Sequence, residues 1–141
     1  HATNPLRDVC LVELENVINL PTVDLDTLDS VKIGEMISIY GYPHSDHGRL
    51  VLTQQITSVG AKILNEASGI KNKSIVLNIQ SRPGQSGSPI FKLNSSKIVA
   101  MLIGSYAPSG ARGGVSIGGI DPQTLHQTTH AISAEYIKEL L

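Results

Sequence analysis

Short runs in which apolar and polar residues alternate recur along the chain, and this pattern restricts the fold more than any other feature. In the run 74–80, for example, Ile75, Leu77 and Ile79 share one face of an extended chain. A period of two residues is typical of β-strands with one buried face. The sequence therefore predicts a fold rich in strands, which we place at 8–14, 35–42, 50–59, 74–80, 88–93, 97–103 and 115–120.

Turn signals separate these runs and favour a barrel or a sandwich. Glycine occurs 13 times, and Asn94-Ser95-Ser96 predicts a hairpin turn between 88–93 and 97–103. One segment, 132–141, has helical spacing, because its apolar residues fall on one stripe. We therefore expect an all-β fold with a C-terminal α-helix docked on it. The docking stripe comprises Ile132, Tyr136, Ile137, Leu140 and Leu141.

The composition excludes several classes of function. The 141 residues suit one domain, and 40% of them are hydrophobic, which is enough to bury a core. Eleven Lys and Arg against twelve Asp and Glu leave a net charge of −1, so nothing calls for a nucleic-acid partner. The apolar runs fall short of the roughly 20 residues that a membrane span needs. Cys10 is the single cysteine and is interpreted as a packing residue; the lack of disulfides favours a cytosolic, organellar or bacterial setting.

The stretch Gly84-Gln85-Ser86-Gly87-Ser88-Pro89 carries the clearest chemical signal. It lies between the predicted strands 74–80 and 88–93. A nucleophilic serine needs a tight turn that exposes its hydroxyl and directs backbone N–H groups at the developing oxyanion. We therefore predict Ser86 as a nucleophile, with the N–H groups of Gly84 and Ser86 as oxyanion donors. One alternative is a plain Gly-Ser loop. An α/β-hydrolase elbow fits less well, because it needs glycine where Ser88 stands.

This motif, followed by the apolar hairpin 90–103, resembles the nucleophile loop of the trypsin-like serine proteases. Residues 8–14, an aspartate before an aliphatic run, are similar to the strand of the family's catalytic aspartate, and 34–43 is similar to the start of its second barrel. Within the family, the chain resembles the disulfide-free branches, the HtrA/Deg proteases and the staphylococcal glutamyl endopeptidases. The resemblance implies a chymotrypsin-like antiparallel β-barrel. Residues 1–30 would be the end of the first barrel, and 31–141 the second barrel with its closing helix.

The resemblance also implies roles for single residues. Ser86 would be acylated, and Asp8 would orient the base and stabilise its imidazolium. The substrates would be proteins or peptides, and the acyl-transfer chemistry needs no cofactor. Gln80 stands where trypsin has an aspartate, so no acid is there to pair with Lys or Arg, and we expect a preference for a small or apolar residue before the scissile bond. The implied specificity pocket consists of Gln80, Ser81, Leu102, Ile103 and Gly104, with Gly113 and Gly114 as its rim.

The base histidine is missing from the place where the family has it. The family's chain order is histidine, aspartate, serine, and His1 precedes Asp8 by only seven residues. That interval is too short for the strands that separate the two residues in the family. We therefore expect the base on an upstream segment, and we expect the 141-residue chain alone to be inactive.

The remaining histidines all follow Asp8 and do not fit the base. His44, Asp46 and His47 form a candidate metal cluster, but their spacing matches no metal motif, which favours a solvated loop. His126 and His130 lack the glutamate of a zinc-protease motif, so we interpret them as a polar connection before the last helix. No metal site is predicted.

Three functions follow from these observations. The first is a serine endopeptidase completed by its upstream half. The second is a catalytically inactive, protease-like module that serves as a scaffold or binding partner. The third is a protease domain embedded in a polyprotein, including a viral one. The intact loop from Gly84 to Pro89 favours the first.

Overall fold

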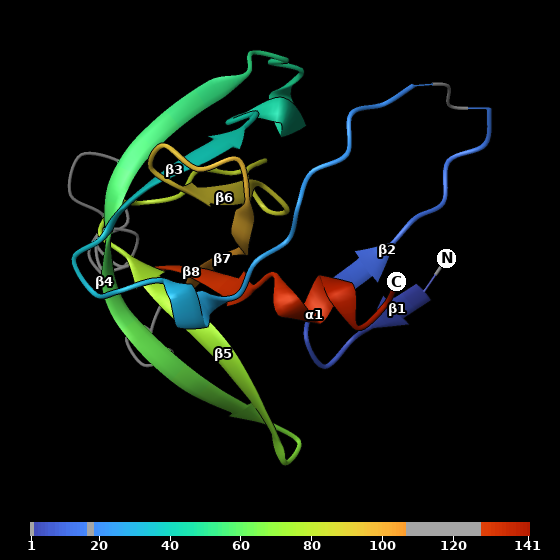
Figure 1. Ribbon diagram of the computed structural model, residues 1–141. Helices are drawn as coiled ribbons and strands as arrows, with labels where there is room; N and C mark the ends of the chain where they lie inside the picture. The colour runs from blue at the N-terminus through green and yellow to red at the C-terminus, as the bar shows by residue number, and fades with distance from the viewer. Residues whose placement is uncertain (1, 17–18, 107–127) are drawn as a thin grey trace, which may run out of the picture.

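A computed structural model describes residues 2–16, 19–106 and 128–141, and its main feature is a closed barrel of antiparallel strands (Figure 1). Around the barrel the strands follow the order β3-β4-β5-β8-β7-β6, and β3 pairs with β6 to close it. This confirms the chymotrypsin-like β-barrel predicted from the sequence. The strands are β3 (Met36–Gly41), β4 (Thr53–Ala67), β5 (Ile70–Leu77), β6 (Pro89–Lys92), β7 (Ile98–Tyr106) and β8 (Thr128–Ser133).

Alternating apolar residues fill the interior of the barrel. Ile37 and Ile39 of β3 are at most 1% exposed, whereas Met36 on the outer face is 43% exposed. Burying each such side chain contributes roughly 1.5–3 kcal/mol, so the alternation determines which face of each strand turns inward. The other core members include Val59, Ile75, Leu77, Ile90, Val99, Leu102 and Ala131.

Two hairpins build most of the barrel. The β6–β7 hairpin is confirmed where predicted, and its turn places Asn94 at a positive φ of 65°. The β4–β5 hairpin differs from the predicted strands 50–59 and 74–80, because its two strands stay paired up to the Ser68-Gly69 turn. Residues 50–52, which we assigned to a strand, precede β4 and are exposed.

The N-terminal arm forms a hairpin outside the barrel, and the predicted buried strand at 8–14 is wrong. Asp8 lies in the hairpin turn with φ 53°, where no strand can continue. Val9 is buried at 4% exposure, but Leu14 is 63% exposed. The described residues cover only one face of this two-stranded sheet, so the aliphatic run does not make a core strand. The hairpin consists of β1 (Ala2–Asn4) and β2 (Val9–Leu11).

The predicted helix at 132–141 is shorter than its apolar stripe suggested. Ile132 pairs with Ser74 of β5 and Met101 of β7, so it belongs to β8. The helix α1 covers only Glu135–Lys138. It does dock as predicted, because Tyr136 packs with Ile132 and with Val9 of the arm. Leu141, the last member of the stripe, is 82% exposed.

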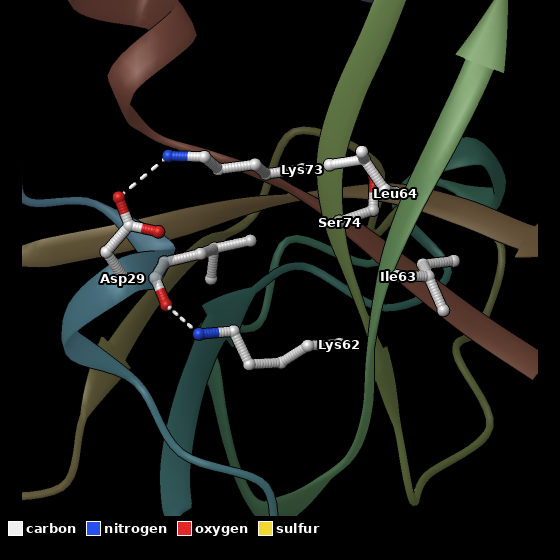
Figure 2. Close-up of a pocket in the computed structure, with 7 residues that line it drawn as sticks. Asp29, Lys62, Ile63, Leu64, Lys73 and Ser74 are labelled. Carbon is white, nitrogen blue, oxygen red and sulfur yellow. Dashed lines mark hydrogen bonds and ion pairs between the residues drawn. The ribbon is translucent and has the colours of Figure 1, made fainter.

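Two lysines from neighbouring strands hold the linker, the segment 19–35 that leads from the N-terminal arm to β3 (Figure 2). Lys62 Nζ donates hydrogen bonds to the carbonyl oxygens of Leu28 (2.6 Å) and Val31 (2.9 Å), at either end of the 3₁₀ turn η1 (Leu28–Ser30). Lys73 Nζ lies 2.7 Å from Asp29 Oδ2, and this bond holds the pKa of Asp29 below its usual range. The two lysines border a cavity of about 260 Å³.

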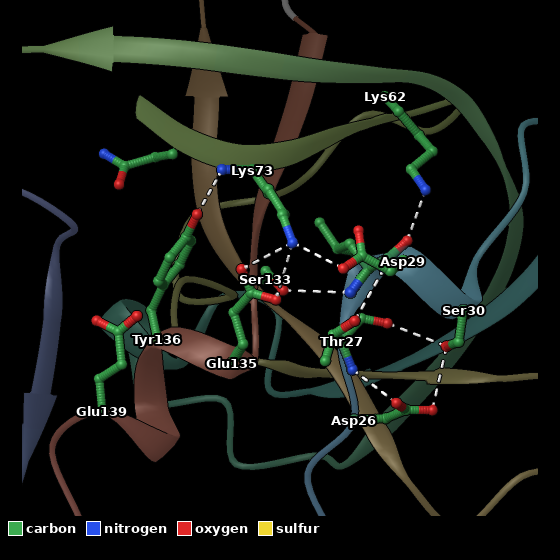
Figure 3. Close-up of polar contacts among 12 residues, drawn as sticks. Asp26, Thr27, Asp29, Ser30, Lys62, Lys73, Ser133, Glu135, Tyr136 and Glu139 are labelled. Atoms are coloured by element: carbon green, nitrogen blue, oxygen red, sulfur yellow. Dashed lines mark hydrogen bonds and ion pairs between the residues drawn. The ribbon is translucent and has the colours of Figure 1, made fainter. Parts of the chain in front are cut away.

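Buried polar bonds then join the linker to the C-terminal segment (Figure 3). The Leu28 N–H donates to Ser133 Oγ (3.2 Å), and the Ser133 side chain is fully buried. The Lys73 N–H donates to Tyr136 Oη over 2.7 Å. These bonds satisfy groups that could not reach water, so they tie the linker, β5 and α1 into one body.

The predicted strand 115–120 and the glycines Gly113 and Gly114 lie outside the described residues. Within the described part of the chain, no helix has the length and apolar character required to cross a membrane.

Candidate active site

The serine loop is a glycine-dependent turn between β5 and β6, as the motif predicted. Gly84 and Gly87 both have φ of +86°, a backbone conformation that side chains disfavour. A Cβ on Gly84 would lie 2.5 Å from Ser45 Oγ and 3.0 Å from the Tyr42 carbonyl oxygen, so the loop also needs glycine there for space. Ser86, between the two glycines, is exposed.

Strand β7 presents this serine. The Gly87 N–H donates to the carbonyl of Leu102 (2.7 Å), and the Leu102 N–H donates to the carbonyl of Ser88 (3.0 Å). Ser86 Oγ in turn donates to the carbonyl oxygen of Ile103 at 3.3 Å. The hydroxyl is therefore anchored beside β7 at the barrel surface.

Two backbone donors of the loop are available for an acceptor. The N–H groups of Gln85, Gly87 and Ser88 are used within the fold. Those of Gly84 and Ser86 make no hydrogen bond to any residue that the structure describes. These are the two N–H groups that the sequence predicted as oxyanion donors.

Asp8 lies beside residues of strand β7. It lines a cavity of about 280 Å³ together with Ile103 and Gly104, which come almost a hundred residues later in the chain. Both of these were predicted as pocket residues. The same cavity also receives Asn65, Ser105 and His130.

Leu102 differs from its two neighbours on β7. Its side chain is 1% exposed within the barrel core, and both of its backbone polar groups bond to the serine loop. Its backbone therefore holds the serine loop through two hydrogen bonds, and its buried side chain does not line an open subsite. Gly114, the last predicted pocket residue, is outside the described ranges.

Gln80 and Ser81 lie on another side of the serine loop. They line a cavity of about 570 Å³ with Gln55 and Arg82. Ser81 nevertheless connects to the strands of the first cavity. Its N–H donates to Thr129 Oγ1 (2.7 Å), and its Oγ lies 2.6 Å from Ser105 Oγ.

His130 is a site residue that the sequence interpretation missed. It was assigned to a polar connection, but it lies on β8 beside the cavity that Asp8 lines. Its Nε2 is 2.9 Å from Thr128 Oγ1, and burial lowers the pKa of the imidazole below its ordinary value. The signal was the alternation of 128–133, in which Thr129 and Ala131 point inward.

Of the two loop histidines, His44 lines the cavity of Gln80 and Ser81. His44 has a left-handed backbone (φ 64°) and opens the 3₁₀ turn η2 (Ser45–His47), whose Asp46 and His47 are exposed with a separation of 3.6 Å. Their exposure agrees with the solvated loop that we favoured. Among the residues with described positions, no three metal-type side chains gather closely enough to hold an ion. His126 falls in the undescribed segment.

The fold and the serine turn define a class: a chymotrypsin-like β-barrel that presents an exposed serine between two glycines. A family model for the trypsin-like peptidase domain matches residues 1–101, and the chain belongs to that family.

Several bacterial proteins named "Probable periplasmic serine endoprotease DegP-like" are similar to this chain. The chain is 32% identical over 115 residues to the one from Pseudomonas fulva and 30% identical over 115 residues to one from Pseudomonas putida; each alignment covers 81% of this chain and 22% of the relative. The protein of that name from Rickettsia conorii is 24% identical over 108 residues, or 77% of this chain and 21% of the relative. The chain thus spans about a fifth of the length of these relatives.

Proposed function

We propose that this chain is part of a serine endopeptidase in which Ser86 is the nucleophile and an upstream segment supplies the base histidine. The observation that carries the proposal is the geometry of the serine loop. Ser86 is exposed on a glycine turn, with the N–H groups of Gly84 and Ser86 unused within the described residues. Two N–H groups beside an exposed serine hydroxyl can both donate to the oxyanion that forms when that hydroxyl attacks a carbonyl.

The reaction would follow the acyl-enzyme route. Ser86 Oγ attacks the carbonyl carbon of the scissile peptide bond while the histidine takes the hydroxyl proton. The N–H groups of Gly84 and Ser86 stabilise the resulting oxyanion. The intermediate collapses, the C–N bond breaks, and the histidine returns the proton to the leaving amine. Water then attacks the acyl carbon while the histidine takes a proton from it. The ester C–O bond breaks, and the histidine returns that proton to Ser86 Oγ.

Asp8 would orient that histidine. Its position in the cavity beside Ile103 and Gly104 supports this role, because the nucleophile Ser86 bonds to the Ile103 carbonyl. A carboxylate there would hold the imidazole in the required tautomer and stabilise it when charged.

Residues 1–30 would be the end of a first barrel that precedes this one. Several apolar side chains of the arm are exposed, including Val12 at 64% and Leu20 at 64%. An exposed row of this kind favours a covering partner. In this proposal the partner is the upstream half that carries the histidine.

The substrate would be a protein or peptide with a small or apolar residue before the scissile bond. Ile103 and Gly104 offer an apolar wall and a place without a side chain, and Gln80 brings no charge. A peptide library digested by the complete protein should show this preference. A profile dominated by Arg, Lys or Glu would contradict it.

The test of the proposal is covalent labelling. The complete gene product and the 141-residue chain are each treated with a fluorophosphonate, and peptide mapping locates the adduct. We expect labelling at Ser86 in the complete product only, and none after Ser86→Ala. Ser96→Ala, in the exposed hairpin loop, is the matched control and should label normally. A folded complete product that never labels would favour the scaffold function instead.

A further inference from the structure

A buried glutamine lies directly before the candidate nucleophile. Gln85 is 1% exposed and is the only glutamine among the buried residues of the described part of the chain. Its Oε1 accepts the N–H of Arg82 at 2.7 Å, and its Nε2 donates to Gln55 Oε1 at 2.6 Å. Both ends of the amide are therefore bonded.

Gln55 belongs to the barrel wall and not to the serine loop. It pairs with Ile39 in the β3–β4 ladder, so its backbone position is fixed. Gln54, the preceding residue, points to the opposite face of β4 and donates to Tyr40 Oη at 2.7 Å. The Gln85–Gln55 bond thus joins the turn to a rigid strand that is thirty residues distant in sequence.

We propose that the Gln85–Gln55 amide pair is a positioning latch that holds the turn 82–88 in the conformation in which the Gly84 and Ser86 N–H groups are not used by the described residues. This inference rests on the proposed function. Three features support it: the amide spans the turn from the Arg82 N–H, it ends on a ladder strand, and it neighbours Ser86 in the chain. No group of the latch touches the reacting atoms, so both glutamines are positioning residues.

Breaking the latch should damage catalysis more than substrate binding. In Gln55→Met the buried Gln85 Nε2 loses its acceptor and must seek another, which lets the turn shift. Loss of one oxyanion donor costs about 10²–10³-fold in kcat, so a partly displaced turn should lower kcat by at least about tenfold. KM should change less than kcat, because the oxyanion donors act in the transition state; Gln55 also lines the cavity of Gln80 and Ser81, so a change of up to about threefold in KM is expected.

The chain supplies a matched control and a rescue. Gln54→Met changes the same residue type one position away, on the other face of β4, and should leave kcat unchanged. Gln55→Glu restores an oxygen acceptor for Gln85 Nε2 and should recover most of the lost kcat. If Gln55 mattered only for packing, Gln55→Met, which has a similar volume, would keep the wild-type kcat.

The experiment measures kcat, KM and the rate of fluorophosphonate acylation for the complete protein and these three variants, with thermal unfolding to show that each is folded. If Gln55→Met fails to fold, Gln85→Asn takes its place, since its shorter amide cannot reach both partners. Wild-type rates in a folded latch variant would overturn this inference alone. A folded wild-type protein that never reacts would overturn the proposed function, and this inference with it.

Discussion

Ser86 Oγ donates a hydrogen bond to the carbonyl oxygen of Ile103 over 3.3 Å, seventeen residues further along the chain. The next residue, Gly104, has no side chain, and a Cβ there would lie 3.8 Å from the same hydroxyl. The hydroxyl is therefore held against β7 in an open position. In the proposed mechanism it must leave this carbonyl for a histidine before it can attack.

The glycine at 84 should be the least replaceable of those with positive φ. A Cβ there would meet Ser45 N at 2.9 Å in addition to the Ser45 hydroxyl and the Tyr42 carbonyl. Gly48 has a similar φ of +77° with no described atom within 4 Å, so it isolates the backbone cost. Gly48→Ala should lower the free energy of unfolding by about 1 kcal/mol, and Gly84→Ala by about 3 kcal/mol or more, because overpacking adds to the strain. Urea unfolding of both variants measures the difference, and equal losses would contradict the clash.

The arm should detach when Arg7 is removed. Arg7 stacks 4.0 Å from the Tyr136 ring, donates to Asn72 Oδ1 at 3.2 Å and pairs with Glu139. Arg7→Ala should lower the local stability of the β1–β2 hairpin by about 2 kcal/mol, the combined value of the partly buried cation–π contact and the hydrogen bond. Hydrogen exchange of residues 2–11 measures this opening.

Arg49→Ala is the control for that exchange measurement, since Arg49 is exposed on a loop apart from the arm. It should leave the exchange of residues 2–11 unchanged. If Arg7→Ala leaves it unchanged as well, the arm is held by other contacts, such as the packing of Val9 and the hydrogen bond from Asn72 Nδ2 to the Leu6 carbonyl. Because Asp8 follows Arg7 directly, a detached arm should also lower kcat in the complete protein under the proposed mechanism.

His130 should make stability depend on pH. Burial lowers the pKa of this imidazole in the folded state, so the unfolded chain takes up a proton at a higher pH than the folded chain does. The contribution of His130 to stability is therefore lost as the pH falls below about 6.5 towards the lowered pKa.

Two measurements check this. An NMR titration of the His130 ring, assigned with His130→Gln, should give a midpoint below the ordinary histidine value. The free energy of unfolding of the wild type should fall more steeply between pH 7.5 and pH 5.5 than that of His130→Gln. A midpoint at or above the ordinary value would show that the cavity does not exclude water from the ring.

Local sequence patterns predict much of the barrel. The alternation around Ile37 and Ile75 determines the inward faces of β3 and β5, because a shift of one residue would expose every apolar side chain. The Asn94 turn determines the β6–β7 hairpin, and the two glycines around Ser86 determine the serine turn. Each of these depends on residues near one another in the chain, so the sequence alone predicts them.

Other features depend on partners that are distant in the chain, and only the tertiary structure decided them. Ile132 has the spacing of a helix, but the open edges of β5 and β7 bond its backbone and make it a strand. Asp8 reads as part of a buried strand, yet the docking of Arg7 and Val9 on α1 places it in a turn beside Ile103. The sequence predicts Gln85 as an ordinary loop residue. In the structure it is buried, because Gln55 and the Arg82 N–H satisfy both ends of its amide. In each case the free energy comes from a contact between distant residues, which no local pattern encodes.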